Sequence, residues 1–194
     1  LASLLDVSVE SLNCTLGEME KKNIIEPLSL SNAPKINSFN FKKYIYSTIG
    51  NRIKFHLILA NSIKRLFADF NTMEMARQFE LANEYEQSVE FLKKEILQAE
   101  EINAYAYKRS LLERALRLNI PEKSLTFLSF ELIKTLYKLS DYKSTLENIY
   151  RLSTARFSID DKNQLQFIKA CSLIGIRKTE EGKSIFLQLL STVN

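Results

Sequence analysis

The chain has 194 residues, of which 45% are hydrophobic and 26% charged, and its formal net charge is +4. Such a composition is that of a folded globular chain, and the small net charge alone does not indicate nucleic-acid binding. There are only 4 glycines and 3 prolines in the 194 residues, whereas in an average protein these two residue types together make up roughly 12% of the chain. This shortage of turn-forming residues excludes collagen-like and low-complexity chains and disfavours β-sandwiches. We expect an all-α fold.

No sign of secretion or of a membrane span is visible in the sequence. No run approaches the 18 apolar residues of a transmembrane helix, and no signal peptide is recognisable. Cys14 and Cys171 are too far apart to form a metal-binding or redox motif. We therefore expect a cytoplasmic protein without a cofactor. Because the chain begins at Leu1, inside a periodic segment, we also expect it to be part of a longer protein.

Residues 1–41 have the pattern of a winged helix that lacks its first helix. A short amphipathic stretch leads to Ser8, a candidate N-cap for a helix over residues 8–22, where apolar residues recur every three or four positions. Two short strands are expected near residues 24–28 and 36–41, on either side of a proline-containing loop. They would form the β wing.

A basic stretch follows the predicted recognition helix. Residues 27–68 contain seven Lys and Arg and no acidic residue, a pattern able to contact phosphates. The helix that would read DNA, however, carries Glu10, Glu18 and Glu20 and no Arg, and carboxylates repel the DNA backbone. We interpret the basic stretch as a solvated face or as a docking face for another domain.

From about residue 71 the sequence predicts repeated helical hairpins, so we expect two domains, 1–70 and 71–194. Tyr85 and Tyr142 each introduce a helix, and each is followed three positions later by a small residue, Ser88 or Thr145. We expect these small residues to be buried where two helices cross. Tyr105 starts a weaker copy, and positions 105, 142 and 179 are 37 apart. This is similar to tetratricopeptide repeats, whose usual period is about 34.

Three stretches together resemble a region of the bacterial signal-transduction ATPases with numerous domains. Residues 1–26 resemble the winged-helix segment that follows their nucleotide-binding domain, 36–67 the segment after the wing, and 75–118 their first tetratricopeptide repeats. The resemblance covers about residues 1–118. It implies a winged helix that packs on an upstream ATPase domain and repeats that bind a partner or hold the parent protein inactive.

No residue pattern predicts an enzyme. Gly182-Lys183-Ser184 resembles part of a phosphate-binding loop, but six residues separate Gly182 from Gly175, where the loop needs four, and no strand precedes it. We interpret Gly182 as the small residue of the last hairpin. His56 is the single histidine, so neither a zinc site nor a catalytic triad can be built around it with any specificity. We interpret it as a packing residue with one hydrogen bond.

A partner-binding surface is expected on the helix after Pro121. One stripe of this helix, Leu125, Leu128, Leu132, Leu136 and Leu139, is expected to face its hairpin mate. A second face forms the candidate groove, made of Phe127, Phe130, Lys134, Tyr137 and Lys138. Aromatic anchors beside lysines suit a peptide with apolar side chains and a carboxylate. The hypothesis requires Phe130, Lys134 and Tyr137 to be accessible together in one concavity; otherwise the two phenylalanines pack on the next hairpin.

The sequence therefore predicts a non-catalytic regulatory or protein-binding segment of a larger signalling ATPase or transcriptional regulator. Its partner would be a protein, a peptide or another domain of the parent, with no membrane and no nucleic acid. The alternative is a DNA-binding transcription regulator that uses the winged helix and whose repeats dimerise or sense a ligand.

Overall fold

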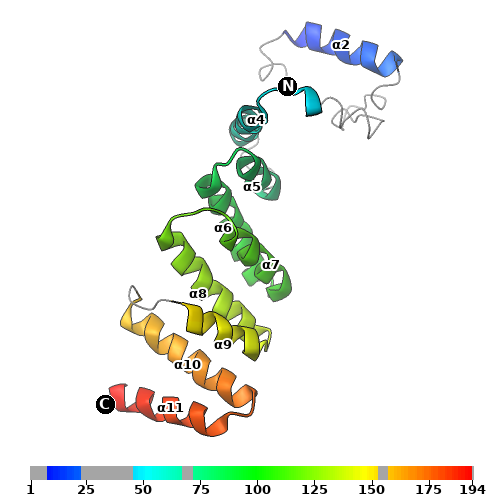
Figure 1. The fold of residues 1–194 in the computed structure, drawn as a ribbon. Coiled ribbons are helices and arrows are strands. Elements are labelled where there is room, and N and C mark those ends of the chain that lie inside the picture. Colours follow the sequence, from blue (N-terminus) through cyan, green and yellow to red (C-terminus); the bar gives the residue numbers. More distant parts are fainter. Residues whose placement is uncertain (1–7, 23–45, 67–71, 153–156, 194) are drawn as a thin grey trace. The chain divides into compact units, whose positions relative to one another are not determined.

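The computed structural model describes residues 8–22, 46–66, 72–152 and 157–193, and within these ranges the chain is helical without a strand (Figure 1). The all-α prediction is confirmed for them, whereas the expected wing strands at 24–28 and 36–41 lie outside the described residues. The helices are α2 (Val9–Lys21), α4 (Arg52–Leu66), α5 (Thr72–Leu81), α6 (Tyr85–Glu101), α7 (Tyr105–Leu116), α8 (Glu122–Lys138), α9 (Tyr142–Arg151), α10 (Ile159–Gly175) and α11 (Thr179–Val193).

The chain forms two compact units, Leu1–Glu84 and Tyr85–Asn194. The first contains α2, α4 and α5, and the second contains α6 to α11. This division is one of packing, and it falls later in the chain than the domain boundary predicted at residue 70. The domain boundary at residue 70 stays a prediction.

In the first unit, the predicted helix over residues 8–22 is confirmed as α2. The Ser8 hydroxyl accepts a hydrogen bond from the Ser11 N–H at 3.1 Å, so it satisfies one of the N–H groups that a helix start leaves without a partner. Helix α4 packs on α5. Ala60 of α4 and Met75, Ala76 and Phe79 of α5 are buried.

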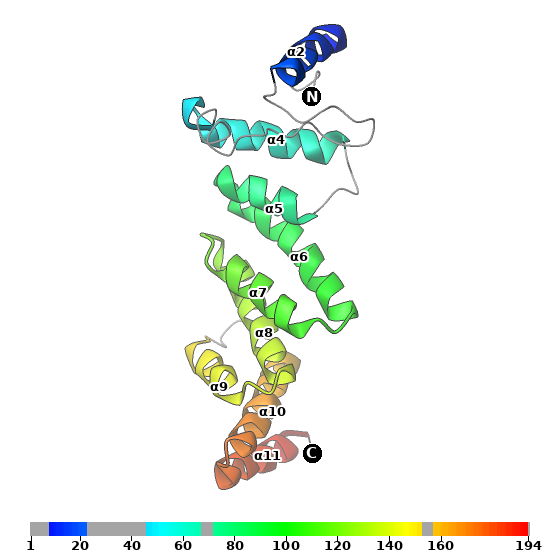
Figure 2. The same cartoon turned by 90° about the vertical axis from the view of Figure 1, so that its right-hand side faces the viewer.

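In the second unit, each helix packs against the next one along the chain, and α8 also contacts α10 (Figures 1 and 2). Short connections join α6 to α7, α8 to α9 and α10 to α11, which form three helical hairpins. Neighbouring helices thus bury apolar residues against one another along the unit.

The same turn ends four helices. Asn83, Asn103, Ser140 and Arg177 have positive φ angles of 60°, 55°, 57° and 69°. In each turn this residue's N–H bonds to the carbonyl three positions back, and the next N–H bonds to the carbonyl five positions back. This is the double hydrogen bond of a Schellman helix ending. The turns at 103, 140 and 177 repeat every 37 residues, as the spacing of Tyr105, Tyr142 and Thr179 predicts.

The residue three positions after the tyrosine that begins α6 or α9 is buried, as predicted. Ser88 and Thr145 are fully buried. At Gly182 an added Cβ would lie 2.7 Å from the Ala170 carbonyl oxygen and 2.7 Å from Ile174 Cγ1, so only glycine fits without a shift. The interpretation of Gly182 as the small residue of the last hairpin is confirmed. The equivalent residue of α7 is Lys108, whose side chain is long and charged.

Candidate functional site

The five predicted groove residues all lie on α8, but they line two adjoining pockets rather than one. Lys134, Tyr137 and Lys138 line a pocket of about 330 Å³. Phe127, Phe130 and Lys134 line another of about 760 Å³. Both pockets are lined by α8 and α10, the smaller one also by α6 and α7, and they share Lys134 and Gln164, so Lys134 stands where they meet. We call this pair of pockets the α8–α10 groove.

Phe130 requires a correction, because it is a core residue and not an exposed anchor. Only 7% of it is accessible. It belongs to a buried cluster with Ile133, Leu165 and Ile168, and its ring centroid lies 5.4 Å from that of Phe157. The reason is that α10 packs on this side of α8, which leaves only part of Phe130 lining the larger pocket. The requirement that Phe130, Lys134 and Tyr137 be accessible together is therefore not met.

The remaining predicted residues keep different degrees of exposure. Phe127 is 51% exposed, and Lys93 from α6 places its Nζ atom 5.9 Å from the centre of the Phe127 ring. Tyr137 is half-buried beside Tyr142, with 6.3 Å between ring centroids. Lys138 is exposed. The groove thus has an accessible aromatic ring in its larger pocket and a lysine in its smaller one.

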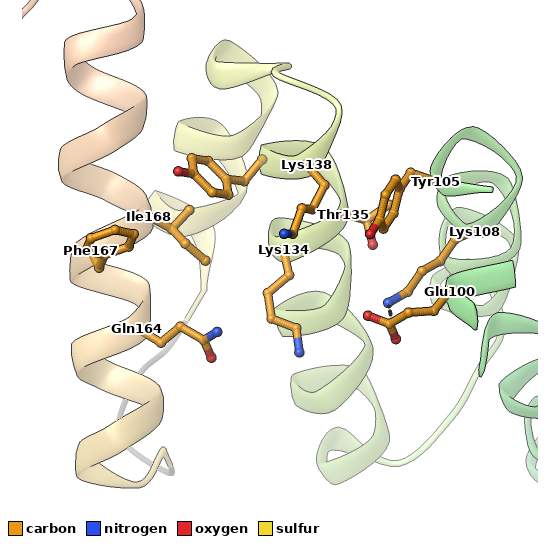
Figure 3. A pocket seen from close by; sticks show the side chains of 10 residues that line it. Glu100, Tyr105, Lys108, Lys134, Thr135, Lys138, Gln164, Phe167 and Ile168 are labelled. Atoms are coloured by element: carbon orange, nitrogen blue, oxygen red, sulfur yellow. Dashed lines mark hydrogen bonds and ion pairs between the residues drawn. The ribbon is translucent and has the colours of Figure 1, made fainter. Parts of the chain in front are cut away.

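The small pocket is bordered by a buried lysine that composition and periodicity do not reveal. Lys108 of α7 is 1% exposed. Its Nζ atom lies 2.9 Å from Glu131 Oε2 of α8 and 3.0 Å from Glu100 Oε2 of α6. Figure 3 shows the bond to Glu100 at one side of the pocket, with Lys134 and Lys138 projecting from α8 and Gln164 facing them from α10.

Glu131 holds two lysines at once. Its Oε1 atom pairs with Lys134 at 2.5 Å and its Oε2 atom with Lys108 at 2.9 Å. Burial tends to raise the pKa of Glu131, but the bonds to Lys134 and Lys108 outweigh it and lower that pKa below the usual 4.5. Burial likewise tends to lower the pKa of Lys108, and the bonds to Glu131 and Glu100 raise it above 10.5. Glu131 and Lys108 are therefore both charged at neutral pH.

The ion pairs decide which cations are available to a ligand. Lys134 is engaged by Glu131, and the charges of Lys108, Lys134, Glu100 and Glu131 cancel. Among the described residues, no carboxylate lies within ion-pair distance of Lys138. The unneutralised positive charge of the small pocket is thus that of Lys138.

One feature of the sequence indicates the ion network. Position 108 stands where Thr145 and Gly182 stand in the later hairpins, and a lysine at a close helix crossing needs a buried carboxylate nearby. Its partner Glu131 could not be identified from spacing alone. It lies 23 residues away on another helix.

His56 in the first unit makes two hydrogen bonds instead of the one expected. It is 5% exposed, with Nδ1 2.6 Å from the Gln78 side-chain oxygen and Nε2 2.9 Å from the Tyr46 hydroxyl. Because an amide oxygen only accepts, the Nδ1–H donates to Gln78, and in the neutral ring Nε2 accepts from Tyr46. This arrangement supports the interpretation of His56 as a residue that joins helices, here α4 and α5.

Comparisons with models of protein families, with curated proteins and with solved structures find no match to this chain. Among the described residues, no three His, Cys, Asp or Glu side chains are grouped so as to hold a metal ion. None of the helices in those ranges has both the length and the apolar character needed to cross a bilayer.

Proposed function

We propose that the chain is a non-catalytic protein-binding module of tetratricopeptide-like repeats, and that the α8–α10 groove binds an acidic segment with apolar side chains. The proposal includes a cytoplasmic setting and a parent protein of the multidomain signalling ATPase type. The supporting observation is the α8–α10 groove itself. Its larger pocket offers the exposed Phe127 ring, and its smaller pocket offers Lys138.

The chemistry of the groove favours a peptide over a small polar substrate. An aromatic ring that is half exposed gains free energy when an apolar side chain covers it, at roughly 25 cal/mol per Å² of apolar surface removed from water. Lys138 adds an attraction for carboxylates. The amide of Gln164, between the two pockets, provides both a donor and an acceptor for a peptide backbone.

The ion network makes this groove a preformed surface. Lys134 cannot turn freely toward a ligand because Glu131 holds its Nζ atom, and Glu131 is itself held by Lys108. Because few flexible side chains then become ordered when a ligand binds, the entropic cost of binding is reduced. We therefore assign Lys134 to the wall of the groove and Lys138 to direct contact with the ligand.

The test is fluorescence anisotropy of a short labelled peptide of alternating Leu and Glu, with a peptide of alternating Leu and Lys as its counterpart. We expect saturable binding of the acidic peptide alone. Phe127→Ala and Lys138→Glu should each weaken it. The matched controls are Tyr150→Ala and Lys143→Glu, which change an exposed aromatic and an exposed lysine of α9 that do not line the groove.

Equal binding of both peptides, or equal losses in the groove variants and the controls, would contradict the proposal. Salt-dependent binding to short DNA duplexes, in the absence of peptide binding, would support the DNA-binding alternative instead.

A further inference from the structure

The two pockets of the α8–α10 groove differ in the charge that they offer to a ligand. In the larger pocket Glu131 pairs with Lys134, and the two other charged residues, Lys123 and Asp161, have opposite signs. In the smaller pocket the excess positive charge is that of Lys138, because the other charged residues belong to the ion network. An acidic side chain therefore fits the smaller pocket, and an uncharged one fits the larger.

Three phenylalanine rings line the larger pocket. Phe127 is 51% exposed, and the rings of Phe130 and Phe157 lie with 5.4 Å between their centroids. A ligand ring beside them can make the tilted or offset contacts that stabilise aromatic pairs beyond the apolar area they bury. The larger pocket thus favours an aromatic side chain over an aliphatic one.

A positively charged ligand group is disfavoured there, although aromatic rings attract cations. Lys134 Nζ lies 5.2 Å from the centre of the Phe130 ring, and Lys93 Nζ lies 5.9 Å from the centre of the Phe127 ring. Two of the three rings therefore already attract a lysine of the chain itself. A neutral ring is the group that gains most from this pocket.

The backbone of the ligand has a partner between the pockets. The side-chain amide of Gln164 lines both of them, and it offers a donor and an acceptor to a chain that passes from one to the other. An extended segment leaves its own N–H and carbonyl groups available for such bonds, whereas a helix uses them internally. The groove therefore suits an extended segment.

The geometry of α8 sets the spacing of the ligand side chains. Lys138 follows Phe130 by eight residues and Phe127 by eleven, which is roughly 12 to 16 Å along a helix axis. An extended segment advances about 3.3 Å per residue, so four residues span about 13 Å. Side chains four positions apart also point to the same side of an extended chain, so both can enter the groove.

We propose that the α8–α10 groove binds an extended partner segment in which an aromatic and an acidic residue are four positions apart. The aromatic side chain enters the larger pocket, and the acidic one lies beside Lys138. This inference rests on the proposed function and adds the kind and the spacing of the ligand side chains. Neither the loops of this chain nor a second copy supplies such a segment, because no pair of an aromatic and an acidic residue four positions apart lies wholly outside the helices.

The test is fluorescence anisotropy of the whole chain with short labelled peptides. Each peptide has one Phe and one Glu in a background of Ser and Thr, two, three, four or six positions apart and in either order along the peptide. We expect the tightest binding at a spacing of four, with binding at least about tenfold weaker at the other spacings. Leu in place of Phe should weaken binding several-fold. The alternating Leu and Glu peptide presents the two residues only at odd separations, and it should bind more weakly than the peptide spaced by four.

Matched variants assign each ligand side chain to its pocket. Phe127→Ala should weaken binding of the Phe peptide much more than binding of its Leu counterpart. Lys138→Glu should lose the Glu peptide and gain the peptide that has Lys in place of Glu at the same spacing. Lys143→Glu changes an exposed lysine of α9 outside both pockets and should alter neither preference. Circular dichroism of each variant checks that the hairpins remain folded.

Binding that does not depend on the spacing, equal binding of the Phe and Leu peptides, or no gain of the Lys peptide by Lys138→Glu would each overturn this inference. In those cases saturable binding of the alternating Leu and Glu peptide would leave the proposed function standing. Absence of binding by every acidic peptide, that one included, would overturn both.

Discussion

Lys108 Nζ and Glu131 Oε2 lie 2.9 Å apart inside the second unit, and they join α7 to α8 at a position where the other hairpins have a small residue. The pair is completed by Glu100 on α6 and Lys134 on α8. A buried pair of this kind contributes less to net stability than its geometry suggests, since both charges have lost their hydration. Removing only one member of the pair costs free energy, because the other charge then stays buried without that partner.

Replacing one member of the pair should therefore be worse than replacing both. Glu131→Leu leaves Lys108 buried with Glu100 as its remaining carboxylate, and we expect a loss of roughly 3 kcal/mol in the free energy of unfolding. The double variant Lys108→Met/Glu131→Leu should recover most of that loss. Urea denaturation of the two single variants and the double variant gives the coupling energy. Additive losses would contradict a direct interaction.

The ion network also predicts how stability depends on pH. The pKa of Glu131 is lowered by the fold, so its contribution is present above 4.5 and is lost as pH falls through the lower folded-state value. The pKa of Lys108 is raised, so its contribution is present below 10.5 and is lost as pH rises through the higher folded-state value. Stability relative to the double variant should be flat between these limits and fall on both sides. A difference that does not change with pH would contradict this.

Helix α11 should not tolerate a side chain at its closest approach to α10. In Gly182→Ala the new methyl group would lie 2.7 Å from the Ala170 carbonyl oxygen, and we expect a loss of roughly 1–3 kcal/mol from the forced shift. Gly17→Ala in α2 is the control, because a Cβ there meets nothing within 4 Å. It should leave stability unchanged or raise it by up to about 1 kcal/mol. Thermal denaturation measures both changes.

Thr145 should behave as a size-limited position in the same way. Its side chain is fully buried, and its hydroxyl donates to the Asp141 carbonyl at 2.7 Å. Thr145→Leu adds volume to a packed crossing and should cost roughly 1–3 kcal/mol, whereas the exposed Glu147→Leu should change little. The melting temperatures of the two variants test this prediction. A tolerated leucine at 145 would contradict the close crossing.

In the first unit, the two hydrogen bonds of His56 should differ in importance. Gln78→Leu leaves the buried Nδ1–H without its acceptor, at a cost of about 1–3 kcal/mol. Tyr46→Phe removes the donor to Nε2 at a part-buried position and should cost less. Urea denaturation of the two variants, together with hydrogen exchange of the amides in α4 and α5, compares the two losses. A larger effect of Tyr46→Phe would contradict the assigned tautomer.

Local features were predictable from the sequence, whereas features that depend on a distant neighbour were not. The few chain-breakers and the 37-residue spacing of positions 105, 142 and 179 predict the helices and the turns at 103, 140 and 177, because capping and left-handed turn residues act over a few positions. The burial of Phe130 depends on α10, and the role of Lys108 depends on Glu131, 23 residues away. An apolar or charged residue on a helix does not show which of several neighbours will cover it.

The ion pair between Lys108 and Glu131 gives each hairpin its own place in the chain. At the following junction the residues 37 positions later are Thr145 and Ile168, both buried and neither charged. The hairpins are thus similar in backbone but not interchangeable, since a folding error that joined α7 to α10 would set Lys108 against Ile168 and leave it with Glu100 as its one remaining carboxylate. Two charged side chains thereby discriminate between neighbours of nearly the same shape, and a chain built from copies of one motif keeps its order.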